Sequence, residues 1–297
     1  MKRIVWLASY PKSGNTWFRM LLANLRSDKP VDINMPGLRG GIASARAQFD
    51  QALLFPSGLL THEECDRLRP LVYREMAREQ DGETPPDELA DGEVRFIKTH
   101  DAWTHVEQGE PLLGGRDVAC GVILIARDPR AVAPSLASHM GLSLDEAISF
   151  LGSRESSFCG RTDRQYRQLR QQLPGWSRYH QGWLDQDVLP VHVLRYEELH
   201  GDTANVLRRA LIFAGIEADD GQIEQAVRFS SFAELKRQEQ DYGFREAPPG
   251  RREQFFRRGL VGGWREELDS GQIGRIEAVH GAMMTRLGYP FRPAAAP

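Results

Sequence analysis

One turn between a strand and a helix most constrains how this chain can fold; it spans residues 9–17 and reads SYPKSGNTW. The apolar run 4–8 before it is typical of a strand that is buried on both faces. After it, apolar residues recur at helical spacing at Phe18, Leu21, Leu22 and Leu25. Gly14 permits a tight bend, and the free N–H groups of the new helix, with the hydroxyls of Ser13 and Thr16, would point at one spot. Such a turn can bind a phosphate-like anion.

The turn differs from the common nucleoside-triphosphate loop, G-x-x-x-x-G-K-[ST], whose lysine follows the second glycine. Here Lys12 precedes Gly14, the first glycine is absent, and Trp17 follows directly. These residues alone therefore leave two interpretations open, an anion-binding loop and an ordinary helix start after a strand.

Composition narrows the class of protein to which this turn can belong. The chain has 297 residues, 41% of them hydrophobic and 27% charged, which is ordinary for one globular α/β domain. The net charge of −3 provides no basic field for a nucleic-acid backbone, so we expect no nucleic-acid partner. The three cysteines show no C-x-x-C spacing and the eight histidines no H-E-x-x-H spacing, so we expect reduced thiols and no metal.

Targeting signals are not evident in the sequence. The apolar run after the first charged residues is too short for a signal peptide, and no stretch reaches membrane-spanning length. We therefore expect a cytoplasmic protein without a membrane partner.

Four strand patterns alternate with helical patterns along the chain. The strands are expected at 4–8, 94–98, 119–126 and 191–194. This alternation predicts βαβ units. The expected fold is thus a single α/β domain over 1–297, with a parallel β-sheet flanked by helices on both faces. The segment 30–93 carries no strand signal and is expected to be a mainly helical insertion, and 239–263 is expected to be a loop.

Helix boundaries are predicted from capping signals. Thr61 with Glu64 and Ser143 with Glu146 form capping boxes, and Asp128 with Pro129 is the favoured start of a helix. Helices are expected over most of 143–183, over 202–214 and 219–238, and from Trp264 to Gly288. Arginines spaced by three are predicted on one side of the first of these, at Arg161, Arg164, Arg167 and Arg170. They form either a solvated helix face or the edge of a site for an acidic ligand.

The carboxyl ends of the predicted strands carry the residues with the most chemical potential. Ligands of parallel sheets collect at these ends. Here the ends place Lys12, Lys98 with His100, Arg127, and Tyr196 at one edge. Two lysines, an arginine, a histidine and an aromatic side chain predict a site for an anionic ligand.

In these features the chain resembles the cytosolic-type sulfotransferases, which move a sulfuryl group from 3′-phosphoadenosine-5′-phosphosulfate (PAPS) to a hydroxyl or amine. Residues 10–17 resemble the family's 5′-phosphosulfate loop, and 98–100 resemble its catalytic-base segment. Arg127 with Ser135 resembles its 3′-phosphate site, and the stretch 257–264 resembles its C-terminal cofactor loop. The resemblance runs from residue 4 to about residue 288. It implies a P-loop-NTPase-like fold, in which the loop 239–263 covers the cofactor or acceptor.

This resemblance implies PAPS as donor, 3′,5′-adenosine bisphosphate (PAP) as product, no required metal, and a small-molecule acceptor with a phenol or alcohol. Sulfuryl transfer is an in-line displacement that depends on positioning and charge stabilisation. A compact ammonium suits the leaving oxygen, and Lys12 is the candidate. His100 is the candidate base, and the charge of Lys98 would keep its imidazole neutral. His139 and His105 are weaker alternatives, and Ser135 is counted with the catalytic residues.

The resemblance implies cofactor-binding residues in three of these segments and, in addition, at Tyr196, Ser230 and Phe232. Trp17 and Tyr196 would flank the adenine together with Ser230 and Phe232, and Arg127 would anchor the 3′-phosphate. Arg257 and Arg258 are either a solvated pair or, beside Gly259, part of the cofactor site. The full set is Lys12, Ser13, Gly14, Asn15, Thr16, Trp17, Arg127, Ser135, Tyr196, Ser230, Phe232, Arg257, Arg258 and Gly259.

Two other functions remain open from the sequence. A P-loop kinase or other ATP-using phosphotransferase would need magnesium and a Walker-B aspartate, whereas the longest apolar strand ends at Arg127. A non-catalytic anion- or nucleotide-binding module is disfavoured by the acidic net charge. The family's dimerisation motif is missing after Trp264, so the oligomeric state stays open. Aromatic candidates for the acceptor pocket are Trp103, Phe150, Trp183, Tyr242 and Phe244.

Overall fold

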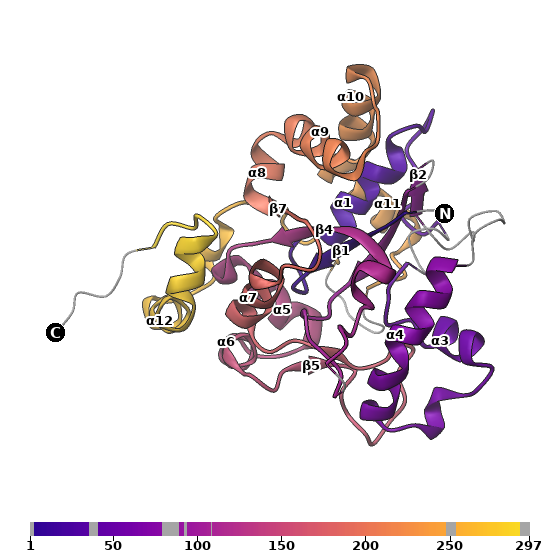
Figure 1. Cartoon of the computed structure of the whole chain (residues 1–297). Helices are drawn as coiled ribbons and strands as arrows, with labels where there is room; N and C mark the ends of the chain where they lie inside the picture. The colour runs from indigo at the N-terminus through magenta and orange to yellow at the C-terminus, as the bar shows by residue number, and fades with distance from the viewer. Residues whose placement is uncertain are drawn as a thin grey trace.

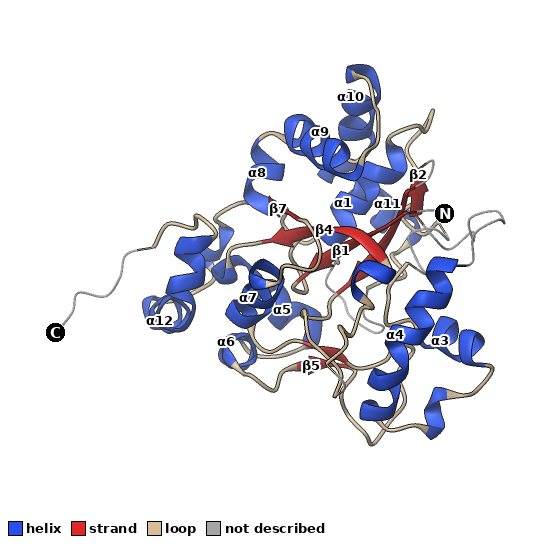
Figure 2. Cartoon of the chain, viewed as in Figure 1, coloured by secondary structure: helices blue, strands red, loops and turns tan. Residues whose placement is uncertain are grey.

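A central sheet with helices packed on both faces makes up the body of the protein (Figures 1 and 2). The computed structural model describes residues 3–35, 41–78, 94–107, 109–247 and 254–291, and the backbone of 89–91. Four strands of the main sheet are parallel: β1 (Arg3–Ser9), β3 (Val94–Thr99), β4 (Ala119–Ala126) and β7 (Val191–Arg195). The predicted α/β fold and all four predicted strands are therefore confirmed.

The order of strands in this sheet is β2-β3-β1-β4-β7. The edge strand β2 (Leu89–Asp91) was not predicted, and the expectation that 30–93 contains no strand was wrong. Three residues are too few to show an alternating pattern, and β2 is held by antiparallel pairing with β3 rather than by its own sequence.

Alternate residues of the strands belong to two separate hydrophobic cores, one on each face of the sheet. Ile4, Trp6 and Ala8 of β1 point into a core built with α4 (His62–Arg78), α5 (Pro129–Met140), α7 (Trp176–Asp185) and α12 (Ser270–Arg286). Val5 and Leu7 point to the other face, against α1 (Asn15–Asn24), α9 (Thr203–Ala214) and α10 (Asp220–Phe229). Burial on both faces explains why these strands are nearly continuous apolar runs.

The remaining elements are short or peripheral. They are α3 (Arg46–Leu53), α6 (Leu144–Gly152), α8 (Tyr196–Gly201), α11 (Phe232–Tyr242), the 3₁₀ turns Ser57–Leu59, Gly115–Asp117 and Gly263–Glu266, and the small hairpin of β5 (Ser157–Phe158) with β6 (Gln171–Gln172). The predicted caps are confirmed: Ser143 and Glu146 form a complete capping box, and the Asp128 side chain accepts from Arg130 N with Pro129 at the first turn. The N–H of Glu64 donates to Thr61 in the same way.

The prediction that helices fill most of 143–183 was wrong. Between α6 and α7 the chain bends, and the four arginines do not share a helix face. Local pairs such as Arg161 with Asp163 stabilise bends there. Backbone bonds from Arg46 N to Arg167 O (3.0 Å) and from Leu169 N to Ser44 O (2.7 Å) hold the chain extended against a distant segment.

Two other helix boundaries also differ from prediction. The helix expected over 219–238 is split at Ser231, which caps α11 by accepting from Glu234 N, and α11 continues to Tyr242. Residues 239–242 of the predicted loop are therefore helical. The helix expected from Trp264 begins instead at Ser270, where Asp269 and Gln272 form a capping box.

A buried ion pair links α4 to the residues that follow β3. Arg69 is fully buried, and its guanidinium donates to both carboxylate oxygens of Asp101, at 3.1 and 2.5 Å. It also donates to Tyr73 Oη and Arg170 O. A buried pair must be complete to be tolerated, so this contact fixes the residue that follows His100.

Candidate functional site

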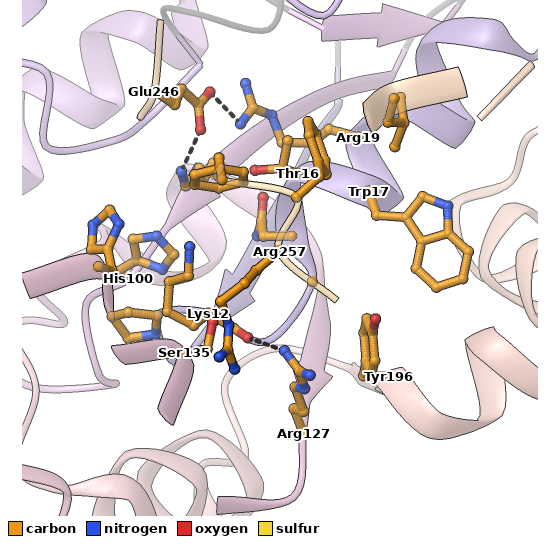
Figure 3. A pocket seen from close by; sticks show the side chains of 18 of the residues that line it. Lys12, Thr16, Trp17, Arg19, His100, Arg127, Ser135, Tyr196, Glu246 and Arg257 are labelled. Carbon is orange, nitrogen blue, oxygen red and sulfur yellow. Dashed lines mark hydrogen bonds and ion pairs between the residues drawn. The ribbon is translucent and has the colours of Figure 1, made fainter. Parts of the chain in front are cut away.

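The carboxyl ends of the parallel strands open into a cavity of about 710 Å³ (Figure 3). Its wall combines the β1–α1 turn, the ends of β3 and β4, the start of α8, and segments from α5, α11 and the C-terminal third. Of the predicted site residues it includes Lys12, Gly14, Asn15, Thr16, Trp17, Lys98, His100, Arg127, Ser135, Tyr196, Phe232, Arg257, Arg258 and Gly259. Ser13 and Ser230 lie outside the described wall.

The β1–α1 turn is held in a conformation that requires glycine. Gly14 has φ +98°, and a Cβ built there would lie 2.6 Å from Cδ2 of Tyr196. The Asn15 amide donates to Leu7 O and Ser9 Oγ, both at 3.1 Å, which ties the start of α1 to the end of β1. The first N–H groups of α1 are thereby fixed at the cavity. Ser13 is buried, and its Oγ has no hydrogen-bond partner in the described structure.

Lys12 brings a buried cation into the wall. Its Nζ lies 3.8 Å from the centre of the Phe255 ring. Burial, followed by the charges of Arg127 and Lys98, lowers the pKa of Lys12 to about 7. The charged form is therefore costly in this buried position, and an anion that enters the cavity would stabilise it.

His100 is oriented by the backbone of β1. Its Nδ1 lies 2.7 Å from Ser9 O, an acceptor, so Nδ1 carries the proton and Nε2 keeps its lone pair. Burial and the charge of Lys98 lower the pKa of His100 well below its usual value. The imidazole is thus neutral near pH 7 and able to accept a proton at Nε2.

The structure adds a carboxylate that the sequence analysis missed. Glu246 bridges Arg19 Nη1 at 2.8 Å and Lys98 Nζ at 3.2 Å (Figure 3). Burial alone would raise the pKa of Glu246, but Arg19 and Lys98 lower it to about 2. Arg19, buried among the apolar residues of α1, was a usable signal for a buried partner. Nothing local distinguishes Glu246 from other acidic residues.

Arg127 and two aromatic rings form another part of the wall. Arg127 Nη1 donates to Lys12 O at 3.0 Å, and its Cζ lies 4.2 Å from the centre of the Tyr196 ring. Its Nε is buried and has no hydrogen-bond partner among the described residues. The Trp17 ring meets Tyr196 edge-on at 5.7 Å, and its Nε1 donates to Ser230 O at 2.9 Å. Ser230 therefore positions Trp17 from behind.

Arg257 and Arg258 already have partners. Arg257 pairs with Glu267, and Arg258 pairs with Glu266 and Glu267. Gly259 has φ +61°, and a Cβ there would lie 2.5 Å from the Phe232 ring, so the close approach that this glycine allows is to a side chain.

Of the alternative bases and acceptor-pocket residues proposed from the sequence, only His139 lines the described wall of the cavity. His139 lines the cavity, whereas His105 lies beside Trp103, outside the described wall. None of the five aromatic residues proposed for the acceptor pocket contributes to the described wall. Trp103 and Trp183 pack on each other in the core at 5.3 Å, and Tyr242 is exposed. The phenylalanines that do line the cavity are Phe158, Phe232, Phe255 and Phe256.

The described residues contain neither a candidate metal cluster nor a candidate membrane span. No group of three or more histidine, cysteine, aspartate or glutamate side chains could hold a metal ion there. No described helix is both long enough and apolar enough to cross a membrane.

Sequence comparison gives a match over nearly the whole chain. The family described as sulfotransferase domain matches residues 2–288. Cytosolic sulfotransferase 13 of Arabidopsis thaliana is 25% identical over 181 residues, which are 56% of this chain and 52% of that protein. The match thus spans about half the length of this curated relative.

Solved structures share the fold at lower identity. Mouse sulfotransferase SULT7A1 complexed with PAP matches with a TM-score of 0.56 and 17% identity, over 96% of this chain and 85% of that one. Retinol dehydratase with androsterone and inactive cofactor PAP matches with 0.59 and 19%, over 98% and 83%. The same protein with retinol and PAP gives 0.58 and 20%, over 97% and 83%. At these identities the likeness concerns the fold.

The geometry of the turn predicts a specific sensitivity at Gly14. Gly14→Ala should lower the free energy of unfolding by about 1–3 kcal/mol, because alanine is strained at this φ and its Cβ would displace Tyr196. The exposed Gly274 of α12 is the matched control, since a Cβ there has nothing within 4 Å. Gly274→Ala should be neutral or stabilise by up to ~1 kcal/mol. Urea denaturation measures both, and equal changes would contradict the account.

Proposed function

The chain belongs to the sulfotransferase domain family, as the sequence predicts, and we propose that it transfers a sulfuryl group from PAPS to a hydroxyl of a small-molecule acceptor. One observation carries this proposal. A buried lysine, a neutral histidine and a partly unsatisfied arginine, Lys12, His100 and Arg127, line a single cavity from three different strand ends. Such a set suits a reaction between an anionic donor and a protonated nucleophile.

The donor would lie across the strand ends. Its 5′-phosphosulfate would accept hydrogen bonds from the N–H groups at the start of α1, where the helix dipole favours an anion. The 3′-phosphate would accept from the unsatisfied Nε of Arg127 and from Ser135. The adenine would contact Trp17, Tyr196 and Phe232.

To bind the donor, the two C-terminal arginines would have to exchange their carboxylate partners for its phosphate. Arg257 and Arg258 are paired with Glu266 and Glu267. A phosphate dianion would compete with these partly exposed pairs, whose net stabilisation is small. In this proposal the described residues of 239–263 cover both the donor and the acceptor, and the described residues of 30–93 help enclose the acceptor.

The proposed step moves one proton and exchanges one bond to sulfur. The acceptor hydroxyl gives its proton to His100 Nε2 as its oxygen bonds to sulfur, and the bond between sulfur and the phosphate oxygen breaks to release PAP. Charge develops on that leaving oxygen, where the Lys12 ammonium would stabilise it. Lys98 would keep His100 neutral before the step.

Two comparisons support parts of this proposal that the cavity leaves open. The similar structures that contain androsterone or retinol support a small acceptor with an apolar body. The name of the Arabidopsis relative supports a cytosolic location.

The proposed base can be tested by replacing it. His100→Ala should lower kcat by ~10²–10⁴-fold, because proton removal loses its catalyst. Transfer of radiolabelled sulfur from PAPS to a panel of phenols and alcohols measures this, without added metal. An acceptor that is already ionised should be affected less, and PAP affinity should be nearly unchanged. Equal losses for ionised and neutral acceptors would remove His100 from the role of base.

The lowered pKa of Lys12 predicts that PAP binding takes up protons. In the protein without PAP, the Lys12 amine is mostly neutral at pH 8, since its pKa is about 7. The phosphate of PAP should raise that pKa, so up to about one proton per PAP should enter from the buffer. Calorimetry in two buffers of different ionisation enthalpy measures the uptake. Lys12→Met should bind PAP with that uptake removed, and unchanged uptake in this variant would contradict the assignment.

A further inference from the structure

The charges of the cavity wall are strongly unbalanced. Its described residues include only one carboxylate, Glu246. The cationic side chains of the wall are Lys12, Arg19, Lys98, Arg127, Arg167, Arg245, Arg257 and Arg258. Because the net charge of the whole chain is −3, the positive charge is concentrated at the site.

Most of these cations either pair with a carboxylate or belong to the proposed donor site. Arg19 and Lys98 share Glu246, and the two C-terminal arginines pair with Glu266 and Glu267. Lys12 and Arg127 belong to the proposed donor site. The guanidinium groups of Arg167 and Arg245 remain, and neither has a hydrogen bond or ion pair with any described residue.

Arg167 lies on a wall that continues the sheet edge outward from the proposed base. Segment 41–43 bonds to Lys98, with Ala43 N donating to Lys98 O at 2.8 Å. Segment 44–46 in turn bonds to 167–169, and Ala45 and Gln168 form an antiparallel bridge. Lys98 pairs with β1 on one side and with Ile42 on the other, and β7, which Tyr196 follows, lies beyond β1. This chain of contacts therefore begins next to His100 and leads away from Tyr196. Arg167 therefore belongs to the acceptor half of the cavity.

Arg245 is held beside the same half. Its N–H donates to Asn34 Oδ1 at 2.9 Å, and the next residue, Glu246, reaches Lys98. Rings also line this part of the cavity. His139 is stacked with Phe158 at 6.2 Å and meets Phe255 edge-on at 6.4 Å.

From these contacts we infer that the acceptor is an anion: a phenol or alcohol with an apolar body and a carboxylate, sulfate or phosphate group. The apolar body would contact Phe158, Phe255 and His139. The anionic group would pair with Arg167, assisted by Arg245, because a guanidinium fork matches such groups. This inference rests on the proposed function, since it names the substrate class of that reaction.

Two acceptors that differ in a single carboxylate show the effect of that charge on the reaction. The probes are 3-(4-hydroxyphenyl)propionate and its methyl ester, which share the reacting phenol and differ in the carboxylate. We expect kcat/KM for the acid to exceed that for the ester about tenfold. Salt should reduce this ratio, because both arginines are exposed.

The arginines are tested through the acid-to-ester ratio of kcat/KM. Arg167→Ala with Arg245→Ala should lower the ratio about tenfold, and Arg167→Lys should retain part of it. Arg161→Ala is the control, because Arg161 lies on the same segment, pairs with Asp163 and is outside the described wall. Its ratio should match that of the unmodified protein.

The outcomes separate this inference from the proposed function. Label transfer with no preference for the acid, or a ratio unaffected by the double variant, overturns the inference and leaves the sulfotransferase activity standing. If the double variant loses PAP affinity by the same factor as it loses kcat/KM for the acid, the arginines belong to the donor site, and this result also overturns the inference. If neither acceptor is labelled and PAP does not bind, the proposed function fails and the inference fails with it.

Discussion

The site of this protein depends on four parallel strands that end at nearly the same level. Ala8 pairs with Thr99, Ser9 with Ile125, and Ala126 with Arg195. Because the register aligns these ends, the residues that follow each strand meet around one cavity, although nearly 190 positions separate the first from the last. The buried pair of Arg69 and Asp101 then fixes the end of β3, where a shift would move His100.

The second constraint is electrostatic. Several cations are held close together in a partly buried cavity, where burial disfavours charge. One internal carboxylate, Glu246, offsets two of them, and Lys12 responds with a pKa of about 7. The wall of the cavity is thus short of negative charge, which an anionic donor supplies. Binding and the protonation of Lys12 are expected to be coupled for this reason.

Local signals explain how much could be predicted from the sequence. Apolar runs located the four parallel strands, and capping residues such as Ser143 located helix starts, because both signals lie within the element itself. The arginines at 161–170 have helical spacing, but their conformation is set by backbone bonds to 44–46, more than 100 residues earlier. Glu246 was missed for the same reason, since its partner Lys98 is 148 positions away. The roles of Lys12, His100 and Arg127 remain predictions.

The most direct test of the central claim is the affinity for PAP relative to AMP, measured by calorimetry without magnesium. If Arg127 and Ser135 receive the 3′-phosphate, two hydrogen bonds to a charged group are lost with it, each contributing ~1.5–3 kcal/mol. We predict that PAP binds at least ~100-fold more tightly than AMP, and that Arg127→Ala removes most of this difference with little effect on AMP. Equal affinities for the two nucleotides in the unmodified protein would contradict the account.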